Sequence, residues 1–238
     1  MKLSKRLETV ASMVTKGNRA ADVGCDHGFV PIFLVESGIS PLAVAADVRP
    51  GPLSRAKEHI KEHRLEEKIQ TRLSDGLANI KPGEADSLIM SGIGGILMMR
   101  LLQDEEHTAK SFKELILSPQ SELFDVRRYL VSNGYLIEYE HMLCDEGKFY
   151  FIFHVLVKKD EREWSEEEYR YGKDICKDDI KTFLAYLEKE ERQYEQILEK
   201  MKQAPENDRA VQRIAQLHQD ITCLKKRRQL VYDCGCFA

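Results

Sequence analysis

Apolar strands and amphipathic helices alternate through about residue 158, and this alternation restricts the fold more than any other feature of the sequence. Five apolar segments are predicted strands: RAADVG, PLAVAADV, KIQTRLSD, ADSLIMSG and KELILSP. We interpret them as five βα units, whose strands should be parallel and covered by helices on both faces. Two further apolar segments, YLIEYEHMLCD and KFYFIFHVLVKK, flank Glu146-Gly147 without a helix between them, which predicts a hairpin. The sequence therefore predicts a mostly parallel seven-stranded α/β sheet with an antiparallel strand near one edge.

A charged, helix-forming segment follows from about Trp164. Apolar residues at alternating steps of three and four predict one helix on each side of Pro205-Glu206-Asn207-Asp208. The first series is Cys176, Ile180, Phe183, Leu187, Glu190, Tyr194, Ile197 and Met201, and the second is Val211, Ile214, Leu217, Ile221, Leu224 and Val231. We expect an antiparallel coiled coil, because a single solvated helix, the alternative, would expose both apolar seams. The predicted domains are residues 1–160 and a helical coiled-coil domain over residues 161–238.

Composition and charge exclude several classes of protein. The 36 basic and 40 acidic residues give a formal net charge of −4, so binding to a polyanion would need local basic patches. No apolar run approaches the roughly 18 residues of a membrane span, and no signal-peptide pattern opens the chain. We therefore expect a cytoplasmic protein with no membrane partner, and a monomer.

The cysteines form no CxxC pair and predict neither a disulfide framework nor a zinc site. They are Cys25, Cys144, Cys176, Cys223, Cys234 and Cys236. We expect no bound metal, and we interpret Cys234-Gly235-Cys236 as a frayed tail.

The turn after the first strand reads DVGCDHG over residues 22–28 and leads into a helix. Ligands of open α/β sheets bind beyond the carboxyl ends of the strands, where Gly24 and Gly28 let the backbone approach closely. A dinucleotide fingerprint would have its second glycine at Asp26. A carboxylate there repels a pyrophosphate but accepts hydrogen bonds from an ammonium group, which favours a ligand with an amine and a carboxylate. The alternative is an ordinary turn with Asp22 and Asp26 as caps.

Acidic or glycine-rich segments also follow the next three strands. Asp47 lies about 20 residues after the turn, where a carboxylate can accept both hydroxyls of a ribose. Asp75-Gly76 can accept from an adenine amino group and donate to a ring nitrogen. The SGIGG loop at residues 91–95 leaves room for a flat group against bare backbone. Each segment has a simpler interpretation as a loop, a turn or a helix start, but together they indicate an adenosine-containing ligand.

These residues resemble a known series of motifs. The chain resembles class I S-adenosylmethionine-dependent methyltransferases in four motifs: Asp22-x-Gly24-x-x-x-Gly28, Asp47, Asp75-Gly76 and the glycine loop. More narrowly, the chain resembles the bacterial tRNA (adenine-22-N1)-methyltransferase family at Ser4-Lys5-Arg6-Leu7, at Asp26-His27-Gly28 and in the SGIGG loop. The resemblance implies a Rossmann-type domain followed by a coiled-coil domain, S-adenosylmethionine as cofactor, and methyl transfer to N1 of adenine 22 in the D-loop region of tRNA.

The resemblance also implies roles for individual residues. The cofactor-binding residues would be Asp22, Gly24, Cys25, Asp26, His27, Gly28, Asp47, Val48, Asp75, Gly76 and Ser91. Within this set the turn at residues 24–28 surrounds the methionine moiety, Asp47 binds the ribose and Asp75-Gly76 binds the adenine. The glycine loop lies beside the target base, and the catalytic residues would be Ser91, Gly92 and Gly94.

Little acid–base chemistry is expected of these residues, because a methyl group on a sulfonium is already activated. We expect Ser91 and the carbonyls near Gly92 to hold the N6 amino group, so that N1 points at the methyl group. The family more often has alanine and methionine where this chain has Ser91 and Ile93, and Gln-Pro-Asn where it has Ser118-Pro119-Gln120.

Two groups of basic residues are candidates for binding tRNA despite the acidic total. The first, expected near the pocket mouth, is Lys2, Lys5, Arg6, Lys16 and Arg19, and the second, on the last helix, is Lys225, Lys226, Arg227 and Arg228. A solvated helix face is the alternative for the second group. Other functions stay open at this point: a methyltransferase for another RNA, a protein or a small molecule, a non-catalytic RNA-binding scaffold, or a dehydrogenase, which Asp26 disfavours.

Overall fold

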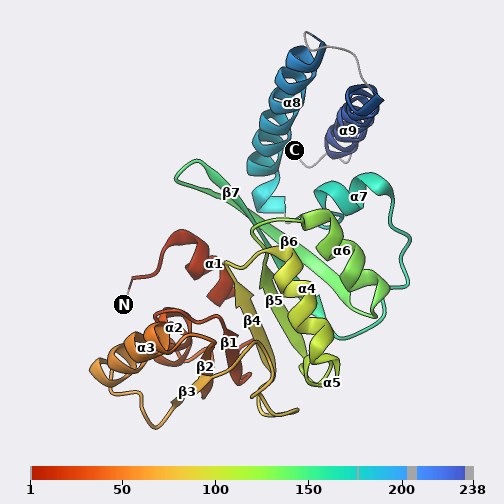
Figure 1. Cartoon of the computed structure of the whole chain (residues 1–238). Helices are drawn as coiled ribbons and strands as arrows, with labels where there is room; N and C mark the ends of the chain where they lie inside the picture. The colour runs from red at the N-terminus through yellow and green to blue at the C-terminus, as the bar shows by residue number, and fades with distance from the viewer. Residues whose placement is uncertain (1, 176, 203–207, 234–238) are drawn as a thin grey trace.

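A seven-stranded sheet forms the middle layer of the computed structural model, which describes residues 2–175, 177–202 and 208–233 (Figure 1). The strands are β1 (Ala20–Val23), β2 (Ala43–Asp47), β3 (Ile69–Leu73), β4 (Ser87–Ser91), β5 (Glu114–Ser118), β6 (Leu136–Asp145) and β7 (Lys148–Leu156). Their spatial order is β3-β2-β1-β4-β5-β7-β6. The first five are parallel to one another, and β7 is antiparallel to both β5 and β6. The predicted sheet is confirmed.

Helices cover both faces of the sheet, because successive strand residues point into two different apolar clusters. Ala20 and Ile89 belong to the cluster covered by α1 (Lys5–Ser12), α2 (Phe29–Glu36) and α3 (Pro50–Glu62). Ala21 and Met90 belong to the cluster covered by α4 (Gly95–Asp104), α5 (Glu106–Ala109) and α6 (Leu123–Ser132). This burial on both sides explains why the central strands are continuous apolar runs.

The hairpin between β6 and β7 turns at Glu146 and Gly147, whose φ angles are 48° and 75°. Two successive residues with positive φ are what a tight type I′ turn requires, so the hairpin predicted from Glu146-Gly147 is confirmed. β7 pairs with β5 only from Phe153 to Leu156. The outer parts of both strands, residues 141–152, therefore continue past the end of β5 as a two-stranded ribbon, which we name the hairpin ribbon (Figure 1).

One predicted feature of the sheet is wrong. Within the described residues no helix follows β3, and residues 74–86 form turns up to the start of β4. The Ser74 hydroxyl donates to the Gly76 carbonyl at 2.8 Å and accepts from the Asn79 N–H at 3.0 Å. Such local bonds compete with helical ones, so four of the five predicted βα units are present.

Two long helices, α8 (Ile180–Lys202) and α9 (Asp208–Asp233), pack side by side and run in opposite directions (Figure 1). A short 3-10 helix, η1 (Lys177–Asp179), precedes α8. Leu187 and Leu224 are buried in the seam as predicted, but near the end of α8 the buried residue is Leu198 and not Ile197. A straight α-helix has 3.6 residues per turn, so five turns from Ile180 lead to residue 198, whereas the prediction assumed a 3.5-residue repeat.

Some predicted residues of the helical part cannot be compared with the structure. Cys176, the turn residues Pro205, Glu206 and Asn207, and the terminal Cys234 and Cys236 lie outside the described residues. In α9, Val211 is exposed although the pattern places it in the seam, and Asp220 is buried beside the predicted Ile221.

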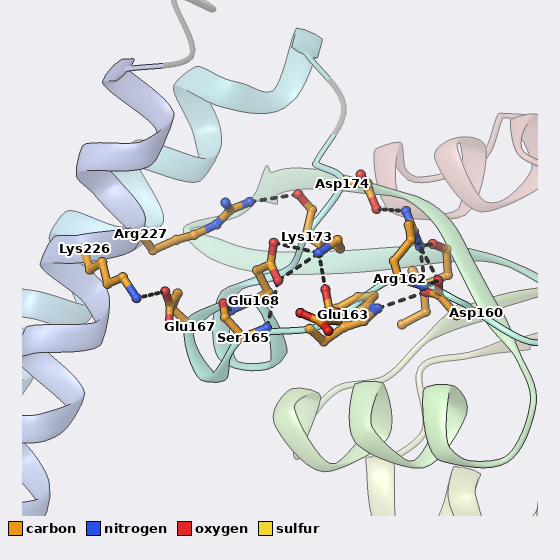
Figure 2. A network of polar contacts seen from close by, with 12 residues as sticks. Asp160, Arg162, Glu163, Ser165, Glu167, Glu168, Lys173, Asp174, Lys226 and Arg227 are labelled. Carbon is orange, nitrogen blue, oxygen red and sulfur yellow. Dashed lines mark hydrogen bonds and ion pairs between the residues drawn. The ribbon is translucent and has the colours of Figure 1, made fainter.

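A polar network fixes the segment that connects the sheet to the helical pair (Figure 2). Arg162 forms ion pairs with Asp160 at 2.8 Å and with Asp174 at 2.6 Å. The Trp164 indole N–H donates to Asp160 at 2.9 Å. The predicted domain boundary at residues 160 and 161 therefore falls inside a bonded cluster.

The same network reaches α9 through α7 (Glu166–Tyr171), which begins with a capping box between Ser165 and Glu168. The Lys173 ammonium pairs with Glu168 at 2.9 Å, and the Arg227 guanidinium donates to the Lys173 carbonyl at 2.9 Å (Figure 2). Lys226 pairs with Glu167. These bonds hold α9 against the connecting segment.

None of the helices in the described ranges is both long and apolar enough to cross a membrane. The same residues contain no group of three or more side chains placed to hold a metal ion.

Candidate functional site

Loops that follow four neighbouring strands line one cavity at the carboxyl edge of the sheet. The strand order reverses between β1 and β4, which is where open α/β sheets bind ligands. The cavity has a volume of about 580 Å³. The predicted residues in its lining are Asp22, Gly24, Cys25, Asp26, His27, Asp47, Val48, Asp75, Gly76, Ser91 and Gly92. Gly28 and Gly94, which the sequence also predicts, are not part of the lining.

The turn after β1 retains a glycine-like backbone at Asp26, whose φ is 48°. Aspartate is one of the few residues that adopt this left-handed conformation at moderate cost, so it can replace the fingerprint glycine. Gly28 has a φ of 72°, and a Cβ there would lie 3.0 Å from Cβ of Ala56 on α3. Gly28 thus lets α2 start close to α3. No side chain caps α2, so its first N–H groups are available to an anionic group.

Asp47 connects the turns after β1 and β2. Its Oδ2 accepts the Asp26 N–H at 3.3 Å, and its Oδ1 accepts the Arg49 N–H at 2.9 Å. The side chain is only 5% exposed. Each carboxylate oxygen retains a further lone pair, so Asp47 can also accept two hydroxyl groups of a ligand.

Asp22 and Cys25 are also buried in the cavity wall. Burial, reinforced by the negative charge of Asp47, raises the pKa of Asp22 to about 7, while the positive charge of Arg6 opposes this. Burial also raises the pKa of the Cys25 thiol, and Asp22 and Asp47 add to the effect. Since the thiolate is the reactive form, Cys25 is not a nucleophile near neutral pH.

The third side of the cavity combines a carboxylate with apolar surface. Asp75 and Gly76 lie in the turn that Ser74 stabilises, and Leu97 and Leu101 of α4 face the same space. A flat heterocycle needs apolar contact on its faces and polar partners at its edge. This wall offers both.

Ser91 ends β4, and its Oγ accepts a hydrogen bond from Nη1 of Arg6 at 2.6 Å. The neighbouring Gly92 has a φ of 84°, and a Cβ there would lie 3.4 Å from the same Nη1. A Cβ on Gly95 would lie 2.5 Å from the carbonyl oxygen of Ser121, and one on Gly94 would lie 3.2 Å from its hydroxyl. Gly94 and Gly95 therefore serve the packing of α4 against the segment before α6, and Gly92 is the glycine of this loop that lines the cavity.

Arg6 and Gln120 line the cavity, although the sequence assigns neither to the cofactor site and expects Arg6 only near the pocket mouth. The sequence places Arg6 in an RNA-binding group, but α1 packs against α2 and the β5–β7 side of the sheet and directs Arg6 to Ser91. The two residues are 85 positions apart, and no spacing rule connects them. For Gln120 a signal existed in the Ser118-Pro119-Gln120 stretch of the family resemblance.

Lys16 and Arg19 lie at the opposite edge of the sheet from the cavity. Arg19 precedes β1 and pairs with Asp86, just before β4, at 2.9 Å. Thr15, next to Lys16, donates its N–H to Glu114, the first residue of β5, at 2.8 Å. The parallel strands begin at this edge and end at the cavity, so the prediction that these two cations lie near the pocket mouth is wrong. Lys5 is exposed on α1, one residue before Arg6.

The basic cluster of α9 has partners within the chain. Lys225 and Arg228 both pair with Glu191 of α8, at 3.4 Å and 2.5 Å. Lys226 pairs with Glu167, and Arg227 lies 5.7 Å over the Phe183 ring. Burial lowers the pKa of Arg227. The four side chains contribute to the packing of the helical pair, and their role in RNA binding stays a prediction.

The doubly covered sheet, the reversal point between β1 and β4 and the carboxylate-lined cavity define a class I methyltransferase. The model of the methyltransferase domain family matches residues 3–153. The chain belongs to this family and, within it, resembles the bacterial tRNA (adenine-22-N1)-methyltransferases over nearly its whole length, as the sequence motifs predicted.

Three comparisons support this assignment. The chain is 28% identical, over 95% of its length and 97% of the relative, to the tRNA (adenine(22)-N(1))-methyltransferase of Bacillus subtilis strain 168. The crystal structure of Sp1610 from Streptococcus pneumoniae, a candidate tRNA (m1A22) methyltransferase, matches with 33% identity and a TM-score of 0.86, covering 95% of this chain and 100% of that one. The complex of Sp1610 with S-adenosyl-L-methionine matches with 32% identity, the same coverage and a TM-score of 0.84.

Proposed function

We propose that this chain is an S-adenosylmethionine-dependent methyltransferase that modifies N1 of adenine 22 in tRNA. The observation that carries the proposal is one cavity in which Asp47, placed for a ribose, lies on the same lining as the Ser91–Arg6 pair. The names of the relatives support it, since the Bacillus subtilis protein is named for this reaction and Sp1610 binds S-adenosyl-L-methionine.

The residues of the cavity fit this cofactor. Asp47 has lone pairs for two ribose hydroxyls, and the exposed Asp26 carboxylate can accept from an ammonium group. The uncapped start of α2 suits a carboxylate. Leu97 and Leu101 can contact the faces of an adenine whose edge meets Asp75. A cavity of about 580 Å³ is within the range of sites for ligands of this size.

Bound in this cavity, S-adenosylmethionine would supply a methyl group on a sulfonium sulfur; the methyl group and the positive charge would pass to the adenine and leave a neutral thioether behind. The task of the protein is to hold the adenine so that the in-plane lone pair of N1 faces that carbon. Arg6 donates to Ser91 and thereby fixes the Ser91 oxygen, which keeps its own proton and one lone pair for the base. Gly92 leaves the adjacent backbone bare, and Gln120 adds an amide at the same side of the cavity.

Methyl transfer to tRNA tests the proposal directly. The protein is incubated with unmodified tRNA transcript and methyl-labelled S-adenosylmethionine, and the modified nucleoside is mapped. We expect label at adenine 22 and none on a transcript with guanine at that position. Label at another position would contradict the base assignment, and absence of label on any tRNA would contradict the function.

Ser91→Ala tests the role of the hydroxyl. We expect kcat to fall about tenfold while cofactor affinity changes little, since one hydrogen bond in the transition state is worth ~1.4 kcal/mol. Ser121→Ala, which removes a hydroxyl outside the cavity lining, is the matched control. Equal kcat values for the two variants would remove Ser91 from the site.

We also infer that residues 1–160 form the catalytic domain and residues 161–238 the helical domain, and that the protein acts as a cytoplasmic monomer. The packing of α8 on α9 supports a separate helical unit. Light scattering of the purified protein tests the oligomeric state, and a dimer mass would contradict it.

A further inference from the structure

A second hollow, of about 410 Å³, lies between the hairpin ribbon and α8. We name it the ribbon groove. It is lined by Pro119, Gln120, Lys148, Phe149, Tyr150, Tyr186, Lys189, Glu190 and Gln193. None of these residues is part of the cofactor-binding set predicted above, and the proposed reaction uses only Gln120.

The ribbon groove adjoins the methyltransferase cavity. Gln120 lines both spaces. Tyr150 lines the groove, and its ring lies 5.5 Å from the guanidinium of Arg6, which bonds to Ser91. A chain that leaves the cavity at Ser91 therefore meets the groove next.

The groove wall is rich in aromatic surface. Phe149 of the ribbon and Tyr186 of α8 pack edge to face, with ring centroids 5.5 Å apart. Tyr150, the next residue of the ribbon, is half-buried and also lines the groove, with its ring on the side of the ribbon that faces Arg6. Aromatic rings at the surface of a groove bind single-stranded nucleic acid by stacking on its bases, in a way that tolerates any sequence.

The groove also holds two lysines, Lys148 and Lys189. Lys189 donates to the Gly147 carbonyl at 3.3 Å and lies 5.2 Å over the Phe149 ring. Both of these partners are uncharged. Within the described ranges, neither Lys148 nor Lys189 is in an ion pair, in contrast to the paired cations Lys225, Lys226 and Arg228 of α9. The single carboxyl group of the lining is Glu190; burial raises its pKa, while Tyr194 and the positive charge of Lys189 oppose this.

We propose that the ribbon groove binds the single-stranded RNA next to the target nucleotide, with Tyr150 stacked on a neighbouring base and with Lys148 and Lys189 on the phosphates. The inference rests on the proposed function, because it takes tRNA as the substrate. It moves the expected RNA footprint from α9 to the ribbon and α8. The alternative ligand is an acidic protein segment. It could pair with the two lysines, but it would use neither the aromatic surface nor the position of the groove next to the cavity.

The test compares Lys148→Gln/Lys189→Gln with the control Lys57→Gln/Lys61→Gln, which removes the same charge from exposed positions of α3. The equilibrium binding of unmodified tRNA is measured over a range of salt concentrations. We expect the groove variant to bind about tenfold more weakly and its salt slope to fall by roughly 1.4, at about 0.7 per phosphate contact with a single strand. S-adenosylmethionine affinity should stay at the wild-type value in both variants and shows that they are folded.

A second pair of variants tests stacking. Tyr150→Phe keeps the ring and should keep the wild-type tRNA affinity, whereas Tyr150→Leu should raise KM for tRNA about tenfold without raising KM for the cofactor. Equal tRNA affinity and salt slope in the groove and α3 variants, or equal KM in the two Tyr150 variants, would overturn the proposal.

The two proposals fail in different ways. Wild-type protein that binds tRNA but transfers no methyl group contradicts the proposed function and leaves the groove to be judged by binding alone. Normal methylation of tRNA by Lys148→Gln/Lys189→Gln, with unchanged affinity, contradicts the groove alone. Wild-type protein that binds no tRNA contradicts both.

Discussion

At the scale of single residues, the cavity carboxylates look alike in the sequence but differ in what surrounds them. The position of Asp47 at a strand end was enough to predict that it lines the cavity, because the carboxyl ends of parallel strands meet at one edge of the sheet. The burial of Asp22 follows from the helices that cover both faces of β1, as predicted for this strand. The contact of Arg6 with Ser91 was not predictable, because it depends on how α1 packs.

Asp47→Ala should weaken S-adenosylmethionine binding at least tenfold, or by ~1.4 kcal/mol. The substitution removes the proposed ribose acceptor and also the bonds to the N–H groups of Asp26 and Arg49. Isothermal titration calorimetry gives the affinity. Asp47→Asn retains one acceptor oxygen, so its affinity for S-adenosylmethionine should lie between those of the wild type and Asp47→Ala. An unchanged dissociation constant for Asp47→Ala would show that the cofactor lies elsewhere.

Asp22→Asn should stabilise the free protein, and more so at higher pH. Burial raises the folded-state pKa of Asp22 from 3.8 to about 7, so the folded state holds this proton more tightly than the unfolded state. The wild type therefore loses stability through this group as pH rises from about 4 to about 7, by at most about 4 kcal/mol, and the variant does not. Urea unfolding at pH 5 and pH 8 measures the difference, with Glu58→Gln on the surface of α3 as control. A stability gain that is the same at both pH values would contradict the burial of this charge.

At the scale of elements, the strands were predictable because buried strands are short apolar runs between turns. Residues 74–86 form turns, although the count of five βα units assumed a helix after every strand. The hydrogen bonds of Ser74 that stabilise these turns are not visible in a hydrophobic pattern. The seam of the helical pair was predicted well at its centre and less well at its end. The error grows along α8 because 3.6 residues per turn and a 3.5-residue repeat diverge with length.

The two possible seams of α8 make different predictions for adjacent residues. Leu198 is buried and Ile197 is 38% exposed. Leu198→Ala should therefore destabilise the protein by about 2 kcal/mol, and Ile197→Ala by less than about 1 kcal/mol. Thermal or urea unfolding of both variants measures this, and the reverse order of stabilities would restore the seam predicted from the heptad pattern.

At the scale of the whole molecule, one buried ion pair joins the sheet to the segment that leads to the helical pair. Arg127 of α6 pairs with Glu140 of β6 at 2.7 Å, and both side chains are fully buried. The same guanidinium donates to the carbonyls of Tyr169 and Arg170 in α7 at 3.1 Å and 3.0 Å. Nothing in the local sequence marks Arg127 as buried, since its partners come from elements up to 43 residues away.

Glu140→Gln should cost about 3 kcal/mol of stability, because it leaves the buried charge of Arg127 without a counter-ion. Asp104→Asn, which breaks the exposed pair with Arg100 on α4, should change stability by less than about 0.5 kcal/mol. Chemical unfolding monitored by fluorescence of Trp164, next to α7, compares the two variants. A cost for Glu140→Gln as small as that of the control would mean that the pair does not connect these elements.

The hairpin ribbon lies outside the register that joins β7 to β5. Its length can therefore change by two residues in each strand without altering the pairing of β7 with β5, and each side chain keeps its face because the strand period is two. On the proposal that the ribbon groove binds RNA, the nucleotide reached would depend on the ribbon, and the handling of the methyl donor on the loops after β1 to β4. The two tasks would then be encoded in separate stretches of the chain.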